Sequence, residues 1–158
     1  MKNNPLSIVS VLLCLLVFNL SNSQADVVEQ TYESVKYHEN VNTSLTDKEL
    51  SQIEEVYGDM TQTLILDNPQ RLKDIKHLLR NRIEIYTEDD LGKQKQTKYL
   101  SEVLLFNKYN KDLKRDAEFD LETFNPLKYS LAFFGKGTYI YRIDNTNYFI
   151  QVTSQYRH

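Results

Sequence analysis

The chain contains little cysteine, glycine, proline or tryptophan, and these shortages exclude several classes of structure and chemistry. Its 158 residues include one cysteine, four glycines, three prolines and no tryptophan. A single cysteine cannot form an intramolecular disulfide or a multi-thiolate metal site, which excludes disulfide-dense extracellular modules and cysteine-based zinc sites. The chain also lacks a glycine-rich phosphate loop and a Gly-x-Ser-x-Gly motif, so the sequence predicts neither a nucleotide site nor a serine hydrolase.

Positive charge is not in surplus either. The chain has 19 lysine and arginine residues against 22 aspartate and glutamate residues, a formal net charge of −3. Nucleic-acid binding requires a basic surface, so the composition argues against a nucleic-acid partner. His38, His77 and His158 are isolated from one another and none has metal-ligand spacing. We therefore expect no metal site and no cofactor.

Residues 1–25 have the pattern of a secretory signal peptide. A positively charged start at Lys2 is followed by an apolar run over residues 8–18, and small residues at Ser23 and Ala25 permit cleavage after either one. A short positive segment, about 7–15 apolar residues and a small-residue exit define such a signal. The sequence therefore predicts an exported protein, periplasmic or extracellular in a bacterium.

Two alternatives to a cleaved signal fit the sequence less well. A membrane anchor requires about 20 apolar residues, more than this run provides. A lipoprotein requires a small residue before Cys14, where Leu12 and Leu13 stand. Cleavage predicts no stable membrane span and leaves a domain without cysteine, which its hydrophobic core alone must stabilise.

The mature chain is expected to begin with a flexible polar leader over residues 26–44, followed by a single globular domain over residues 45–158. Val28, Tyr32 and Val35 have helical spacing, so a short helix within the leader is the alternative.

Capping signals predict a first helix over residues 47–57. Thr46 and Glu49 have the spacing of a capping box, and Gly58 is a typical helix stop. Residues 61–66 are rich in β-forming side chains and predict a strand, with continuation of the helix as the alternative.

A second helix is expected to begin with Asn68 as N-cap and Pro69 in the first turn, and to end near Asn81. Its basic residues and His77 are expected to face solvent, since a charged helix face is usually solvated. The basic residues are Arg71, Lys73, Lys76, Arg80 and Arg82.

Alternating apolar residues predict a strand over residues 82–86 and a three-stranded meander over residues 128–153. A turn at residues 144–147 places Tyr139 opposite Val152, and a loop at residues 135–137 places residues 128–134 beside the same hairpin. The fold class is therefore α+β, with two layers: two main helices packed on a mostly antiparallel sheet of about four to five strands.

The tyrosine-bearing face of the hairpin is expected to belong to the core. The opposite face is mixed in character, and we predict it as the binding surface. Its residues are Ile140, Arg142, Phe149 and Gln151. No catalytic residue is predicted, although Asp89 or Asp116 could serve a carboxylate-dependent hydrolase.

Three stretches of the chain, residues 78–82, 124–129 and 141–148, resemble small exported proteins of environmental bacteria whose function is uncharacterised. The resemblance implies no substrate and no site.

Three functions are compatible with these observations. The favoured one is a non-catalytic exported domain that binds an unknown protein or envelope component. The others are a periplasmic accessory or structural factor of the cell envelope and the carboxylate-dependent hydrolase.

Overall fold

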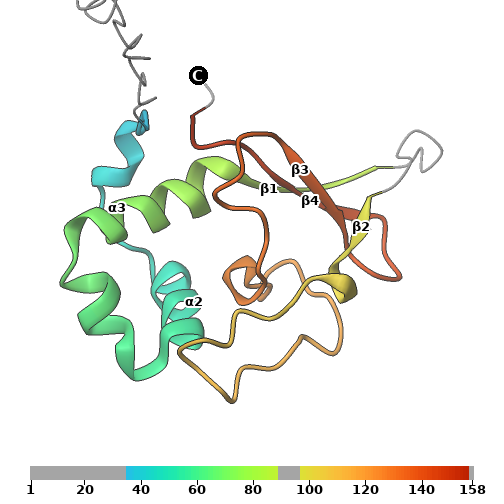
Figure 1. Ribbon diagram of the computed structural model, residues 1–158, viewed down its shortest axis with the longest axis horizontal. Helices are drawn as coiled ribbons and strands as arrows, with labels where there is room; N and C mark the ends of the chain where they lie inside the picture. The colour runs from blue at the N-terminus through green and yellow to red at the C-terminus, as the bar shows by residue number, and fades with distance from the viewer. Residues whose placement is uncertain (1–34, 89–96, 157–158) are drawn as a thin grey trace, which may run out of the picture. The chain divides into compact units, whose positions relative to one another are not determined.

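The computed structural model describes residues 35–88 and 97–156 (Figure 1). The predicted signal peptide, residues 26–34 of the predicted leader and most of the loop expected over residues 87–98 lie outside the described residues. Within the described ranges, no helix is long and apolar enough to cross a membrane.

The first predicted helix is confirmed as α2 (Asp47–Tyr57). The Thr46 hydroxyl accepts a hydrogen bond from the Glu49 backbone N–H at 3.2 Å, and the Glu49 carboxylate accepts one from the Thr46 N–H at 2.8 Å. Gly58 has a φ of +51°, a conformation that other residues rarely adopt, and it ends the helix as predicted.

The strand predicted over residues 61–66 is wrong. After α2 the chain stays helical through η2 (Gly58–Met60) and the π-helical η3 (Gln62–Leu66). The helical course buries Ile65 against Ile53 and Val56 of α2. A strand here would require a neighbouring strand for its backbone groups, and the residues form a packed helix instead.

The second predicted helix is confirmed as α3 (Pro69–His77), which continues into the π-helical η4 (Leu78–Arg82). As predicted, the Asn68 side chain caps it by accepting a hydrogen bond from the Arg71 N–H at 3.1 Å. The chain then passes directly into the sheet.

The sheet has four strands in the order β1-β4-β3-β2, and it is antiparallel except for the pairing of β2 with β3. Its strands are β1 (Ile83–Thr87), β2 (Lys98–Tyr99), β3 (Tyr139–Arg142) and β4 (Tyr148–Val152). The predicted hairpin register is confirmed, with Tyr139 opposite Val152 and Tyr141 opposite Ile150.

The first strand of the predicted meander does not form. Residues 128–134 contribute one isolated bridge, between Tyr129 and Leu105, because β1 pairs along β4 and β2 pairs along β3. The β4 edge of the hairpin is therefore occupied along its length, and the β3 edge is occupied at Tyr141 and Arg142. The segment is fixed instead by side chains: the Tyr141 hydroxyl accepts a hydrogen bond from the Ala132 N–H at 2.9 Å.

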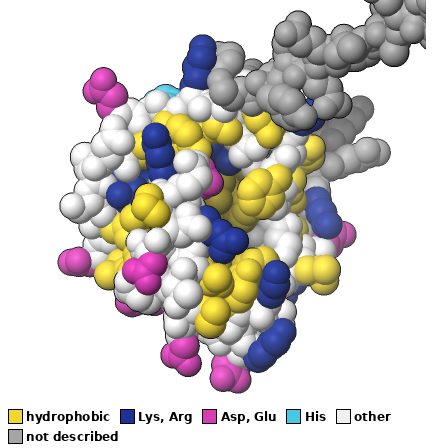
Figure 2. Space-filling view, turned by 60° about the vertical axis from the view of Figure 1, so that its left-hand side comes forward, with side chains coloured by type: hydrophobic (Ala, Val, Ile, Leu, Met, Phe, Trp, Pro, Cys, Tyr) yellow, Lys and Arg dark blue, Asp and Glu magenta, His cyan; other side chains and the backbone are white. Residues whose placement is uncertain are grey.

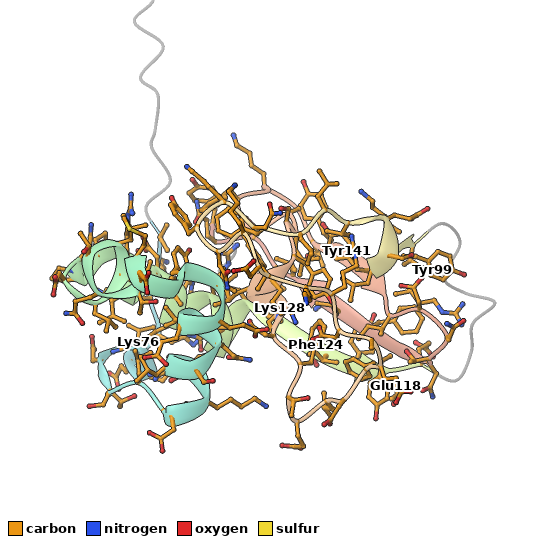
Figure 3. The ribbon with its side chains drawn as sticks, turned by 90° about the horizontal axis from the view of Figure 1, so that it is seen from below. Lys76, Tyr99, Glu118, Phe124, Lys128 and Tyr141 are labelled. Atoms are coloured by element: carbon orange, nitrogen blue, oxygen red, sulfur yellow. The ribbon has the colours of Figure 1, made fainter. Side chains whose placement is uncertain are left out.

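The hydrophobic core has two clusters. One packs the inner face of the sheet against the irregular segment of residues 100–131, and the other joins the helices to Leu127. Figure 3 shows Phe124 and Tyr141 in the part next to the sheet and Lys76 among the helices. Ile83 and Phe133 pack against both clusters. The α+β class, with two main helices and a mostly antiparallel sheet, is confirmed.

Residues 35–44, assigned to the leader by the sequence analysis, pack on α3 and form η1 (Glu39–Asn42). Val41 is 3% exposed, and the Lys76 ammonium donates to the Thr43 carbonyl at 2.7 Å. The prediction of a solvated helix face is therefore wrong for Lys76, Arg80, Arg82 and His77. Three of them are buried, and the Arg80 guanidinium bonds to the Ser44 carbonyl at 2.8 Å.

Candidate functional site

The four residues predicted as a binding surface share one face of the β3–β4 hairpin. Arg142 lies opposite Phe149, and Ile140 lies opposite Gln151. Phe149 is 1% exposed and stacks on Tyr86 of β1 with ring centroids 5.8 Å apart. None of the four lines either hollow described below, and their role in binding stays a prediction.

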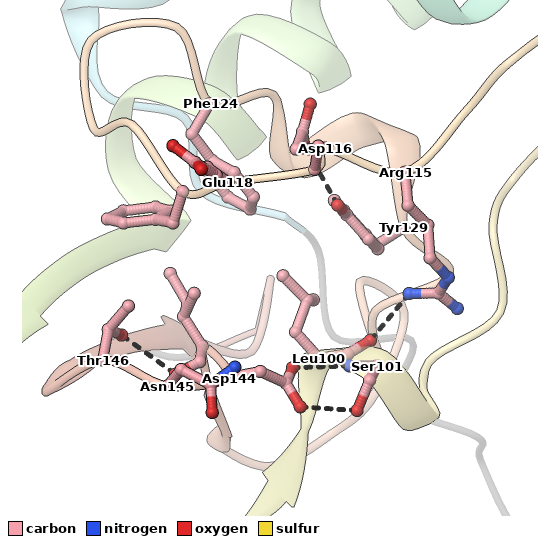
Figure 4. Close-up of a pocket in the computed structure, with 13 residues that line it drawn as sticks. Leu100, Ser101, Arg115, Asp116, Glu118, Phe124, Tyr129, Asp144, Asn145 and Thr146 are labelled. Carbon is pink, nitrogen blue, oxygen red and sulfur yellow. Dashed lines mark hydrogen bonds between the residues drawn. The ribbon is translucent and has the colours of Figure 1, made fainter.

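An acidic cleft of about 520 Å³ lies between η5 (Leu100–Glu102), the segment of residues 115–119 and the β3–β4 turn (Figure 4). Three carboxyl groups line it, those of Asp116, Glu118 and Asp144. The structure thus brings Asp116, a residue singled out from the sequence, into a cleft with two other acids. Asp89, the other acid singled out, lies outside the described residues.

Two of these three carboxylates accept hydrogen bonds that hold the cleft walls together. Asp144 accepts hydrogen bonds from the Ser101 N–H at 2.9 Å and the Ser101 hydroxyl at 2.6 Å. Asp116 accepts from the Lys128 ammonium at 2.5 Å and the Tyr129 hydroxyl at 2.9 Å. Burial, and then the bond to Asp116, raise the pKa of Tyr129 to about 12.

Glu118 and Asp116 are exposed, and Asp144 is half-buried. A glycoside hydrolase requires one carboxyl kept protonated by an apolar setting and a second one kept ionised. The apolar side chains that line the cleft beside the three carboxyls are those of Leu100, Phe119, Phe124 and Ile143. The hydrolase therefore stays a prediction.

A second hollow, of about 400 Å³, lies beside α3, and we call it the helix cavity. One wall comes from α3 and η4, and the facing wall comes from residues 127–134. Its apolar lining consists of Val35, Tyr57, Ile75, Leu78, Phe106, Leu127, Tyr129, Leu131, Phe133 and Phe134. Its polar lining consists of Asp74, His77, Arg82, Ser130 and Gln155. Figure 2 shows one face of the molecule, with hydrophobic and basic side chains in its middle and acids mostly at its rim.

Two buried basic groups stand in the wall of the helix cavity. His77 is 5% exposed, and burial, followed by the charge of Arg82, lowers its pKa below the usual 6.5, so the ring is neutral at pH 7. Arg82 is 6% exposed, and burial lowers the pKa of its guanidinium. Arg82 donates to the Thr153 carbonyl at 3.1 Å and also to the Phe133 carbonyl.

Phe134, which also lines the helix cavity, is 83% exposed. Sequence reasoning treated Phe134 only as part of a strand.

The sequence contained one usable signal for Arg82. Ile75, Leu78 and Arg82 are spaced i, i+3 and i+7, which places the arginine on the apolar face of the helix. For His77 no local signal existed, because the rings of Tyr37 and His38 that lie against it are distant in the chain.

Among the described residues, no group of three or more histidine, cysteine, aspartate or glutamate side chains could hold a metal ion. The polar groups of the helix cavity are few and set in an apolar wall, an arrangement suited to holding a ligand by burial and orienting it with a few hydrogen bonds.

Comparison with known proteins gives no family: no family model, curated protein or solved structure matches the chain.

Proposed function

We propose that the protein is an exported, non-catalytic binding domain that takes up a small apolar ligand in the helix cavity. The observation that carries this proposal is the cavity itself, about 400 Å³ in volume and lined mainly by hydrophobic side chains. Ligand sites are typically apolar hollows of about 300–1,000 Å³ with a few polar groups. The exposed Phe134 at the same hollow supports entry of the ligand from solvent.

A neutral apolar fluorophore, N-phenyl-1-naphthylamine, tests uptake directly. Titration into the protein of residues 26–158 should give saturable fluorescence enhancement with one site per chain. The variant Ser130→Trp should weaken binding at least about tenfold, because Ser130 is an exposed residue that lines the cavity and a large side chain there narrows it. Absence of saturable binding would overturn the proposal.

The matched control is Ser51→Trp, which places the same side chain on an exposed position of α2 outside the cavity lining. It should leave fluorophore affinity unchanged. Equal weakening by both variants would indicate binding elsewhere on the surface and would count against the cavity.

Export is the second part of the proposal, and the signal pattern of residues 1–25 supports it. The full chain should be processed when produced in a bacterium. N-terminal sequencing of the mature protein should begin at Asp26, or at Gln24 if cleavage follows Ser23. Recovery of the intact chain from the cytoplasm alone would contradict export.

A further inference from the structure

Arg82 is a buried cation that no described carboxylate reaches at ion-pair distance, although the charge of Asp74 partly offsets the lowering of its pKa by burial. Its Nε and Nη2 donate to the Thr153 and Phe133 carbonyls, and no ion pair joins it to a described acid. No hydrogen bond from its remaining nitrogen, Nη1, joins it to a described residue. Burying a charge is costly unless an anion compensates it, and this charge stands in a cavity wall.

His77 adds a neutral donor to the same wall. The amides of Asn40 and Asn81 pair reciprocally at 2.8 and 3.0 Å, which makes Asn81 Nδ2 a donor. That nitrogen lies 3.2 Å from His77 Nδ1, so Nδ1 is assigned as the acceptor and the ring carries its proton on Nε2. The cavity wall thus holds one cationic and one neutral donor.

We infer that the helix cavity binds an aliphatic chain with an oxyanion head group, a carboxylate or a phosphate, with the head group at Arg82 and His77 and the chain against the apolar lining. The guanidinium suits both oxyanions because its planar donors match their oxygens. The inference rests on the proposed function and adds the chemical class of the ligand.

Asp74 is the acid in the cavity lining. Its Oδ1 accepts hydrogen bonds from the Tyr37 hydroxyl and from the Gln70 amide, the latter at 2.9 Å. Burial lowers the pKa of both basic groups, Arg82 and His77, whereas the charge of Asp74 raises it. Because Asp74 repels an anion, the attraction of the head group must come from Arg82 and His77.

Calorimetric titration of the protein of residues 26–158 with three ligands of equal chain length tests the inference. The ligands are laurate and monododecyl phosphate, each below its micelle concentration, and dodecanol below its solubility limit. At least one oxyanion should bind ten or more times tighter than dodecanol, since a charge-assisted hydrogen bond contributes at least about that factor. Shortening the chain should weaken binding about fourfold for each methylene removed.

The outcomes separate the inference from the proposed function. If dodecanol and both oxyanions bind with equal affinity, the head-group inference fails and cavity binding stands. If none of the three binds, both fail. A preference for laurate identifies a carboxylate, and a preference for the dodecyl phosphate identifies a phosphate.

In the variant Arg82→Gln, the oxyanion should bind no more than about twofold tighter than dodecanol. The affinity for dodecanol itself should be unchanged. Arg71→Gln is the matched control, because it removes the same charge from an exposed position of α3 outside the cavity lining. If both variants lose the preference for the oxyanion equally, that preference comes from the overall charge and the inference is overturned. If Arg82→Gln does not fold, the three-ligand comparison decides alone.

Discussion

Arg80 connects three parts of the chain through one guanidinium. Its Nε lies 2.5 Å from Oε1 of Glu49 and its Nη2 lies 2.6 Å from Oε2, a two-pronged ion pair with side chains 13% and 12% exposed. The same guanidinium donates to the Thr43 hydroxyl at 2.7 Å and the Ser44 carbonyl at 2.8 Å. Glu49 therefore both caps α2 and anchors η4.

The variant Glu49→Gln should lower the free energy of unfolding at pH 7 by about 2 kcal/mol, because it replaces charge-assisted hydrogen bonds with neutral ones. The hydrogen bond from Arg80 lowers the pKa of Glu49 below its usual 4.5. A lowered folded-state pKa stabilises the protein above the unfolded-state value, and this contribution is lost as the pH falls through the folded-state value. In urea unfolding, the difference in free energy of unfolding between wild type and variant should therefore shrink below pH 4.5.

Glu54→Gln provides the control, since Glu54 is an exposed acid on the same helix. It should change the free energy of unfolding by less than about 0.5 kcal/mol at any pH. If the difference in free energy of unfolding between wild type and Glu49→Gln is constant with pH, the assignment of a lowered pKa to Glu49 is contradicted.

Among the secondary-structure elements, η6 (Pro126–Lys128) is attached to α2 by the side chain of Asn125 as well as by the Lys128–Glu55 ion pair at 3.0 Å. The Asn125 side chain accepts from the Leu127 N–H at 3.0 Å and donates to the Gln52 carbonyl at 2.8 Å and to Glu55 Oε2 at 2.9 Å. Asn125 is 1% exposed, so water cannot replace these bonds without entering the core.

Asn125→Ala should therefore destabilise the protein by about 3 kcal/mol, measured by chemical denaturation, because it leaves buried backbone groups without partners. Asn107→Ala, at an exposed position of the same irregular segment, should cost less than about 0.5 kcal/mol. Similar costs for the two variants would show that the attachment of η6 to α2 by Asn125 is unimportant.

The elements that could be predicted from the sequence are those fixed by neighbouring residues. The capping box of Thr46, the Asn68 cap and the register of the β3–β4 hairpin each depend on residues close together in the chain. The pairing of β1 with β4 and of β2 with β3 depends on residues far apart in the chain, and no local pattern indicated it. Residues 128–134 alternate like a strand, but distant strands occupy the positions beside the hairpin.

The same distinction applies to the candidate site. The helix cavity forms where α3 and η4 face residues 127–134, and the sequence could not indicate that these segments meet. The four residues predicted as a binding face could be placed on one side of the hairpin because their register is local. The stacking of Phe149 on Tyr86 of β1 is not local and could not be predicted.

For the molecule as a whole, the packing of residues 35–44 on α3 predicts that the stable unit begins before residue 45. These residues bury Val41 and supply the acceptors of Lys76 and Arg80. A chain starting at residue 45 should lose about 4 kcal/mol, the sum expected for one buried valine and several hydrogen bonds. Its Tm should fall about 15 °C below that of residues 26–158. Val41→Ala should reproduce only part of this loss, since it leaves the hydrogen bonds in place, whereas equal Tm values for the two chains would establish residue 45 as the start of the folded domain.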